Sequence, residues 1–231
     1  MLSDLRDSGC LTGDTLVTLA DSGERVEMRD LIGRTGFSVW ALNPTTYKIE
    51  KATVAKAFST GTKQTYRLTT RLGRTIRATG NHQFLTVKGW ERLDELAAGV
   101  HLALPRRLPA GDAPLMGQAE LALLGHLIGD GCTLPRHAIQ YTTKERDLAE
   151  CVAGLARDVF GSAVSPRIVQ ERTWFQVYLA STRHHTHGTR SAVCEWLDGL
   201  GVWGLSSYEK RVPEQIFTQD ATGIALFLRH L

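Results

Sequence analysis

The spacing of apolar residues changes near the middle of the chain, and this change limits the possible folds more than any other feature. Before residue 105 they fall in short runs separated by turn signals such as Asp21-Ser22-Gly23, and after residue 117 they recur at helical spacing. Residues 105–117 hold three prolines and two glycines. Because proline restricts φ and lacks an amide hydrogen, this segment is predicted to link two domains.

The first hundred residues are predicted to form an all-β module, because many short β-rich runs alternate with turns. The predicted strands are Thr15–Leu19, Phe37–Leu42, Ala52–Ser59, Thr65–Thr70, Thr75–Ala78 and Phe84–Val87. Two short helices, Met28–Ile32 and Arg92–Ala97, are expected to interrupt this module.

The second half is predicted to be α+β, because helical spacing and strand alternation both occur there. Thr142 and Glu145 have the spacing of a capping box at the start of a helix. The predicted elements are a helix with the apolar stripe Leu121, Leu124, Leu127 and Ile128, a helix ended by Gly161, a strand at 167–180 and a helix at Ser191–Leu200.

Charge and cysteine content exclude several classes of protein. The net charge is +3, which is too small to indicate a nucleic-acid binder by itself. The four cysteines are scattered with no Cys-x-x-Cys pair, which argues against a zinc knuckle or a disulfide framework and favours a reducing cytoplasm. No apolar run reaches the ~20 residues of a membrane span. We therefore expect a cytoplasmic protein with no membrane partner.

One cysteine and one histidine have the context of thiol chemistry. Cys10 comes after the small residues Ser8 and Gly9, and Thr79-Gly80-Asn81-His82 lies some seventy residues later. A free thiol and a distant imidazole are the minimum for acyl transfer. Alone, this pair is weak evidence for catalysis, because a single cysteine is often only a small buried apolar residue.

The surrounding motifs resemble those of inteins, the self-splicing proteins with the Hint fold. Residues 10–15 (Cys-Leu-Thr-Gly-Asp-Thr) match the opening motif of that family, and residues 78–84 match its Thr-x-x-His motif. Trp90-x-x-Leu93-x-x-Leu96 and the segment 101–105 resemble the stretch after this motif in relatives from replicative helicases. The resemblance implies that residues 10–110 form the N-terminal part of a Hint splicing domain.

The resemblance also implies a role for each site residue. The sulfur of Cys10 would attack the carbonyl of Gly9, so that Gly9–Cys10 is the scissile bond. His82 would protonate the departing nitrogen, and Thr79 would hold the scissile peptide and stabilise the oxyanion. Splicing of this kind needs no cofactor.

The first nine residues indicate a host protein. Leu2-Ser-Asp-Leu-Arg-Asp-Ser-Gly9 resembles a segment of bacterial replicative DNA helicases, so residues 1–9 are expected to be an N-extein remnant, with helicase exteins as partners. An ordinary amphipathic leader is the alternative. The chain has no Gly-x-x-x-x-Gly-Lys-Ser/Thr loop, so it is not expected to be a helicase by itself.

Residues 123–131 resemble the first LAGLIDADG motif of homing endonucleases, which implies that residues 111–231 form a partial endonuclease domain. In that family the motif is a helix that packs closely at small residues, here Gly125 and Gly129, and its terminal Asp130 binds Mg²⁺. Lys210 corresponds to an active-site lysine of the same family. A buried helix ended by an Asp-Gly turn is the alternative.

A polar strand face is the expected contact with double-stranded DNA. Gln170, Arg172, Gln176 and Tyr178 alternate with the apolar residues of the strand predicted at 167–180, and such side chains read a major groove. An ordinary solvated strand explains them equally well. The charge argues against DNA binding, because residues 111–231 carry 11 Lys and Arg against 13 Asp and Glu.

The end of the chain departs from the family pattern. Residues 227–231 look like the opening of a second LAGLIDADG helix, and the C-terminal splicing motifs are absent from the sequence. The resemblance therefore implies a split intein or a truncated reading frame that needs a C-terminal intein fragment, and an endonuclease that is inactive alone. Two further interpretations stay open: a DNA-binding or endonuclease remnant with vestigial splicing residues, and an inert structural remnant.

Overall fold

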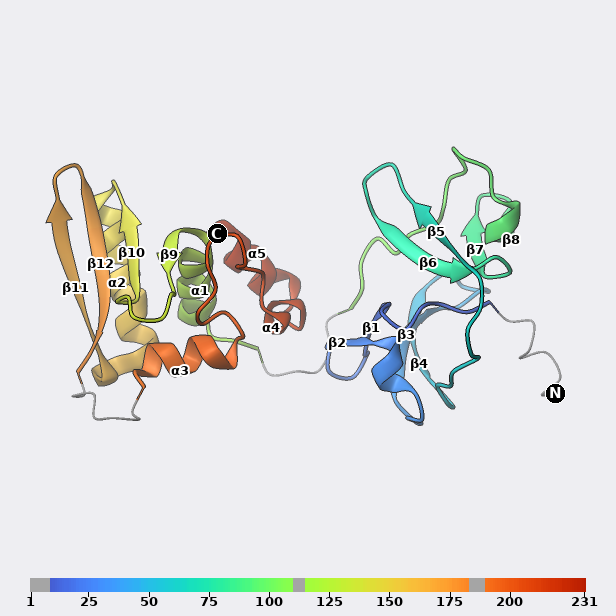
Figure 1. The fold of residues 1–231 in the computed structure, drawn as a ribbon, viewed down its shortest axis with the longest axis horizontal. Coiled ribbons are helices and arrows are strands. Elements are labelled where there is room, and N and C mark those ends of the chain that lie inside the picture. The colour runs from blue at the N-terminus through green and yellow to red at the C-terminus, as the bar shows by residue number, and fades with distance from the viewer. Residues whose placement is uncertain (1–8, 110–114, 183–189) are drawn as a thin grey trace. The chain divides into compact units, whose positions relative to one another are not determined.

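The chain divides into two compact units, residues 1–112 and 113–231, in the computed structural model (Figure 1). The structure describes residues 9–109, 115–182 and 190–231. Residues 1–8, most of the segment predicted to be an extein remnant, lie outside these ranges. No helix among the described residues is long and apolar enough to cross a membrane.

The first unit consists of antiparallel β-hairpins. Its elements are β1 (Leu16–Thr18), β2 (Arg25–Glu27), η1 (Met28–Leu31), β3 (Ser38–Leu42), β4 (Ile49–Thr53), β5 (Thr65–Thr69), β6 (Thr75–Thr79), β7 (Gln83–Thr86), β8 (Gly89–Arg92) and η2 (Leu93–Glu95). Each odd-numbered strand pairs with the strand that comes next in the chain. Isolated bridges join neighbouring hairpins, among them Leu19 with Val39 and Leu11 with Ala78.

The strand predicted at Ala52–Ser59 is wrong beyond residue 53. β4 ends at Thr53, and the chain then pairs with a loop rather than with a strand. Val54 donates to the carbonyl of Phe37, and the amide of Gly33 donates to Ala57. These two bonds hold residues 54–57 against the loop, and the apolar run reflects this packing. Both short helices of this unit are single 3₁₀ turns.

The second unit places helices against an antiparallel sheet with strand order β11-β12-β10-β9. Its elements are α1 (Gln118–Asp130), β9 (Gly131–Cys132), β10 (Gln140–Thr143), α2 (Arg146–Phe160), η3 (Gly161–Ala163), β11 (Val164–Glu171), β12 (Trp174–Ser181), α3 (Ala192–Gly199), α4 (Glu214–Phe217) and α5 (Ala221–Arg229). One apolar core joins α1, α2, α3 and α5 to the sheet.

Two local predictions for this unit are wrong. The strand at 167–180 is a hairpin, because the chain turns at Arg172 and Thr173 between β11 and β12. The expected capping box does not form, because Thr142 is paired within β10. Instead the side chain of Thr143 accepts a hydrogen bond from the amide of Glu145. Gly161 does end α2, with a φ of 53°.

Helix α1 is the centre of the second unit. Residues 121–128 are all buried, so the helix is covered on every side there and not only along the predicted stripe. A Cβ atom on Gly125 would lie 2.8 Å from the carbonyl oxygen of Phe227, and one on Gly129 would lie 2.5 Å from that of Leu231. The two glycines therefore allow α5 and the residue after it to approach the α1 backbone closely.

A histidine pair makes the stability of this unit depend on pH. His126 Nε2 lies 3.0 Å from His230 Nδ1, and its ring meets that of Tyr141 edge-on. Burial and the neighbouring His230 lower the pKa of His126 from 6.5 to about 4, although Asp130 opposes the shift. The unfolded chain therefore takes up a proton between these two pH values before the folded chain does.

We expect the second unit to lose stability as the pH falls from about 6.5 towards 4. The expected loss is about 2–3 kcal/mol, since one pH unit of pKa shift corresponds to about 1.4 kcal/mol. Urea unfolding of the wild type and of His126→Gln at pH 7.5 and 4.5 measures this contribution. Equal pH dependence in the two proteins would contradict the assignment to His126.

Candidate active site at Cys10

Backbone pairing brings Cys10 beside the Thr-x-x-His motif. The segment before β1 lies along β6, where the amide of Thr79 donates to the carbonyl of Cys10 at 2.9 Å. Two residues further on, the amide of Thr12 donates to the carbonyl of Arg77 at 3.3 Å. This register places the two predicted motifs in contact although 69 positions separate Cys10 from Thr79.

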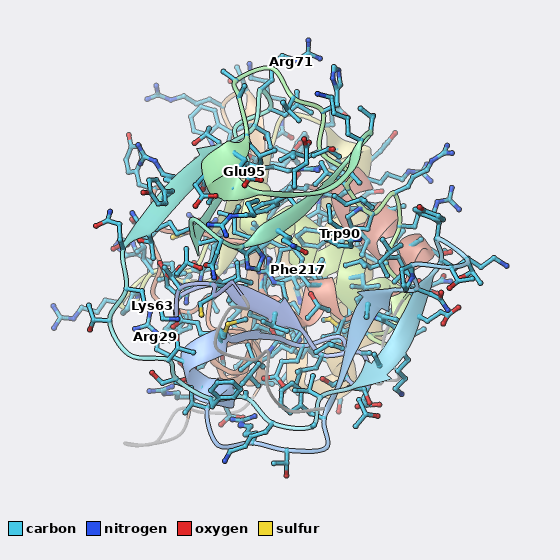
Figure 2. The ribbon with its side chains drawn as sticks, turned by 90° about the vertical axis from the view of Figure 1, so that its right-hand side faces the viewer. Arg29, Lys63, Arg71, Trp90, Glu95 and Phe217 are labelled. Carbon is cyan, nitrogen blue, oxygen red and sulfur yellow. The ribbon has the colours of Figure 1, made fainter. Side chains whose placement is uncertain are left out.

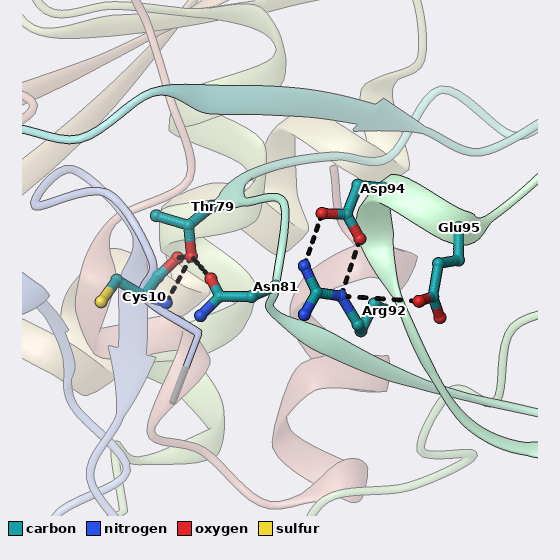
Figure 3. Close-up of polar contacts among 6 residues, drawn as sticks. All are labelled: Cys10, Thr79, Asn81, Arg92, Asp94 and Glu95. Atoms are coloured by element: carbon teal, nitrogen blue, oxygen red, sulfur yellow. Dashed lines mark hydrogen bonds and ion pairs between the residues drawn. The ribbon is translucent and has the colours of Figure 1, made fainter. Parts of the chain in front are cut away.

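The hydroxyl of Thr79 contacts the nitrogen of the predicted scissile bond. Thr79 is buried, and its Oγ1 accepts a hydrogen bond of 2.8 Å from the amide of Cys10 (Figure 3). The same hydroxyl donates to Oδ1 of Asn81 at 2.7 Å. Because this proton is engaged by Asn81, a lone pair of the hydroxyl is directed at the amide of Cys10.

Gly9 lies directly against His82. A Cβ atom on Gly9 would be 2.0 Å from the Cα of His82, so no other residue fits at position 9 unless the backbone moves. The backbone of His82 is held on both sides, because its amide donates to Thr79 and its carbonyl accepts from Leu93. Its ring packs edge-on against Phe84 at 5.2 Å between centroids.

An ion pair supports the turn between Thr79 and His82. Arg92 contacts Asp94 through Nε and Nη2 at 2.9 and 2.7 Å, and lies 3.7 Å from Glu95 (Figure 3). Hydrogen bonding to Arg92 lowers the pKa of the Asp94 carboxyl. The amide of Asp94 donates to the carbonyl of Gly80, and a Cβ atom on Gly80 would lie 2.7 Å from the Asp94 carboxylate. A larger residue at position 80 would therefore displace the Asp94 carboxylate from its present place beside Arg92.

The Cys10 sulfur points towards residues 54–64. Its Sγ lies 3.2 Å from Oγ1 of Thr60 and 3.9 Å from Nζ of Lys63. Gly9, Cys10, Thr79 and His82 line one pocket of about 850 Å³. Lys63 and Arg29, both labelled in Figure 2, line the same pocket. The four predicted splicing residues therefore lie around one cavity.

Asp130 and Lys210 lie at the end of α1 in the second unit. Lys210 Nζ donates to the carbonyl of Leu127 at 2.8 Å and to that of Gly131. Burial lowers the pKa of the Lys210 ammonium, while Cys132 and Asp130 act in the opposite direction. The Asp130 side chain is exposed, and the described residues contain no group of three His, Cys, Asp or Glu that would hold a metal by themselves.

The four predicted DNA-contacting residues do not share one face. Gln176 and Tyr178 do lie on one side of β12, where the Tyr178 hydroxyl donates to Gln176 at 2.6 Å. The guanidinium of Arg167 lies over the Tyr178 ring, 5.2 Å from its centroid. Gln170 is paired opposite Phe175 and so lies on the other side of the sheet, and Arg172 lies in the turn. The prediction of one shared face is wrong because it assumed one continuous strand, whereas contact of these residues with DNA stays a prediction.

A family model described as Intein splicing domain matches residues 17–219. This range covers most of the chain and includes both Thr79 and His82. The chain belongs to the intein family. The matched range crosses the boundary between the two units, and it begins after Cys10, so the assignment of separate functions to residues 10–110 and 111–231 stays a prediction.

Relatives of this intein are found within longer proteins. It is 61% identical to the replicative DNA helicase DnaB of a Nostoc species over 231 residues, all of this chain and 26% of that protein. It is 60% identical to DnaB of Rhodothermus marinus over 230 residues, which are 24% of that protein. The chain thus spans about a quarter of the length of these curated relatives.

Two solved intein structures are similar to this chain in sequence over part of its length. A Ssp DnaB mini-intein, variant M86, is 52% identical over 48% of this chain and 69% of that chain, with a TM-score of 0.44. A DnaB intein from Synechocystis is 53% identical over 42% of this chain and 70% of that chain, with a TM-score of 0.41.

Three residues of the candidate site were not predicted from the sequence. Asn81 lies inside the Thr-x-x-His motif, so its position carried a signal for involvement. Thr60 and Lys63 lie in a segment partly predicted as a strand, and no motif marks them. Only the folded structure brings them to the sulfur.

Proposed function

We propose that this chain carries out the first step of autocatalytic protein splicing within a replicative DNA helicase. The helicase host is supported by the identity to DnaB proteins over the whole chain, including residues 1–9. The step converts the Gly9–Cys10 amide into a thioester. We place the reaction in the cytoplasm, in keeping with four scattered cysteines that include no Cys-x-x-Cys pair.

The contact of Thr79 and His82 with the two sides of one peptide bond carries this proposal. The Cys10 thiol loses its proton, its sulfur bonds to the Gly9 carbonyl carbon, and the C–N bond breaks while the nitrogen gains a proton. Thr79 touches that nitrogen, and His82 lies against Gly9. Imidazole is suited to supply the proton because it exchanges protons near neutral pH. The step needs no cofactor.

A C-terminal intein fragment is the proposed partner for the later steps. The pocket around Cys10 has an apolar wall that includes Val17, Leu31, Phe37 and Val39. Trp40 lines the same pocket, and its indole N–H is buried without a hydrogen-bond partner among the described residues. A docked β-segment would cover the apolar wall.

Thiolysis tests the proposal directly. The chain, mixed with the C-terminal fragment of a related DnaB intein, is incubated with dithiothreitol and its intact mass is measured over time. We expect the mass of residues 1–9 to be lost, because the thiol intercepts the thioester. Cys151→Ala, which removes an exposed thiol in the other unit, is the matched control and retains the cleavage. An unchanged mass in the wild type would reject this function.

A second candidate function is DNA cleavage by the second unit. The close approach of α5 to Gly125 and of Leu231 to Gly129 favours it, as does the placement of Lys210 beside the end of α1. Asp130 is an exposed carboxylate at that end, suited to be one ligand of a Mg²⁺ ion whose remaining ligands are water and DNA phosphates. Such an ion would supply Lewis-acid activation of a phosphodiester.

Mg²⁺-dependent cleavage of an intein-free helicase gene tests this second function. We expect Asp130→Asn to abolish any cleavage and Asp147→Asn, on the neighbouring helix α2, to preserve it. Filter binding with the same DNA at low salt tests the proposed contact through Gln176 and Tyr178. If DNA is neither bound nor cut, the second unit is a structural remnant.

A further inference from the structure

We propose that Lys63 is the electrostatic partner of the Cys10 sulfur and that Thr60 orients this sulfur for attack. The inference rests on the proposed splicing function and adds two residues to it. Both belong to the segment 54–64, which no intein motif of this sequence includes.

The segment is held in place at both ends. Near its start the amide of Val54 donates to Phe37, and the amide of Ala57 donates to Arg34. At its other end β5 begins at Thr65 and pairs with Thr79, the residue that contacts the Cys10 amide. The same hairpin therefore positions both Lys63 and Thr79 relative to Cys10.

A tight turn brings both side chains to the sulfur. Gly61 has a φ of 82°, a left-handed value that favours glycine, and its amide donates to the side chain of Ser59. Thr60 and Lys63 lie on the two sides of this turn. Their polar atoms lie 3.2 and 3.9 Å from the Cys10 sulfur.

Among the cations that line the pocket, Lys63 is the one placed to act on the sulfur. Arg29 is paired with Glu27 at 2.6 Å and donates to the carbonyl of Gly13, so its charge is partly offset. Lys56 lines the pocket too, but it has no described contact with Cys10. An ammonium 3.9 Å from the sulfur attracts the negative charge that the sulfur carries when it attacks.

The charge acts on one half of the reaction only. Loss of the thiol proton to solvent leaves a negative sulfur next to the Lys63 ammonium. The sulfur then bonds to the Gly9 carbonyl carbon, and the negative charge leaves the sulfur. Lys63 keeps its own protons throughout, so it is not an acid or a base in this step. Protonation of the departing nitrogen remains with the Thr79 and His82 side of the bond.

Competitive alkylation of the full chain tests this inference without requiring splicing. Iodoacetamide is applied at pH 7 and low ionic strength, and peptide masses give the modification rate of Cys10 relative to the exposed Cys151 in the same molecule. We expect Lys63→Gln to lower this ratio about 3- to 10-fold. Lys63→Arg retains the charge and should keep the ratio within about 2-fold of the wild type. Lys48→Gln changes an exposed lysine of the same unit that does not line the pocket, so it is the matched control and should also leave the ratio within about 2-fold.

Ionic strength separates an electrostatic role from a structural one. Added salt should lower the wild-type ratio and leave that of Lys63→Gln nearly constant, since screening removes only an existing charge effect. Thr60→Val should slow thiolysis at Gly9–Cys10 while keeping the salt dependence of alkylation. An unchanged ratio in Lys63→Gln, or an equal fall in Lys48→Gln, would overturn the inference.

The outcomes also separate this inference from the proposed function. If the wild type undergoes thiolysis but Lys63→Gln does not change the alkylation of Cys10, the proposed function stands and the role of Lys63 is rejected. If Lys63→Gln lowers the alkylation of Cys10 but the chain never releases residues 1–9, the role of Lys63 stands and the proposed function is rejected.

Discussion

His82→Ala is expected to slow the release of residues 1–9 under thiolysis by about 10²–10⁴-fold, the usual contribution of a positioned acid or base. The Cys10→Ala protein should not release them at all, because it lacks the sulfur that attacks the Gly9 carbonyl. His82 lies directly against Gly9, and we assign the protonation of the departing nitrogen to its imidazole. First-order rates of mass loss at constant dithiothreitol measure both effects.

His101→Ala is the matched control for this pair of variants. His101 belongs to the same unit and is exposed, and it does not line the pocket around Cys10. Its removal should leave the rate within about 2-fold of the wild type, as for most surface changes. A rate in His82→Ala equal to that in His101→Ala would contradict the assignment of proton transfer to His82.

Phe227→Ala is expected to destabilise the second unit by about 3–5 kcal/mol, the range for truncating a fully buried aromatic side chain. Phe227 is completely buried in α5 and belongs to the apolar core around α1. The glycine contacts between α1 and α5 leave little freedom for the helices to close the resulting cavity. Urea-dependent hydrogen exchange of α1 amides reports the free energy of opening of this unit alone.

The adjacent residue provides the control for this stability measurement. Leu228 lies on the same helix with 57% of its surface exposed. Leu228→Ala should therefore change the free energy of opening by less than about 1 kcal/mol. If both variants destabilise α1 equally, α5 acts through its helix propensity and not through the burial of Phe227.

Strong local signals in the sequence predicted much of the fold. Turn residues such as Asp21-Ser22-Gly23 marked hairpins, and the apolar stripe through Leu124 predicted a helix that lies in the core of the second unit. The errors arose where partners distant in the sequence decide the structure. The run after Thr53 packs on a loop, and the alternation at 167–180 hides a turn at Arg172, because period-2 spacing is the same in one strand and in two.

The site was predicted only as far as its motifs reach. Cys10, Thr79 and His82 were identified because each belongs to a motif with a chemical rationale, and the structure places them around one pocket. Thr60 and Lys63 are common surface residues in a segment without a pattern. Their proximity to the sulfur depends on the register between β6 and the segment at Cys10, which sequence spacing does not reveal.

Main-chain hydrogen bonds pair Cys10 and Thr12 with β6, in addition to the bond from the Cys10 amide to the Thr79 hydroxyl. Main-chain hydrogen bonds do not depend on the flanking side chains. They hold the residues at the Gly9–Cys10 bond in an extended conformation without recognising their sequence. The structure selects only for the size of the residue before Cys10, because the space beside His82 fits a residue without a side chain. If the Gly9–Cys10 bond reacts as proposed, we expect the junction to be transferable to other host proteins in which a glycine precedes the cysteine.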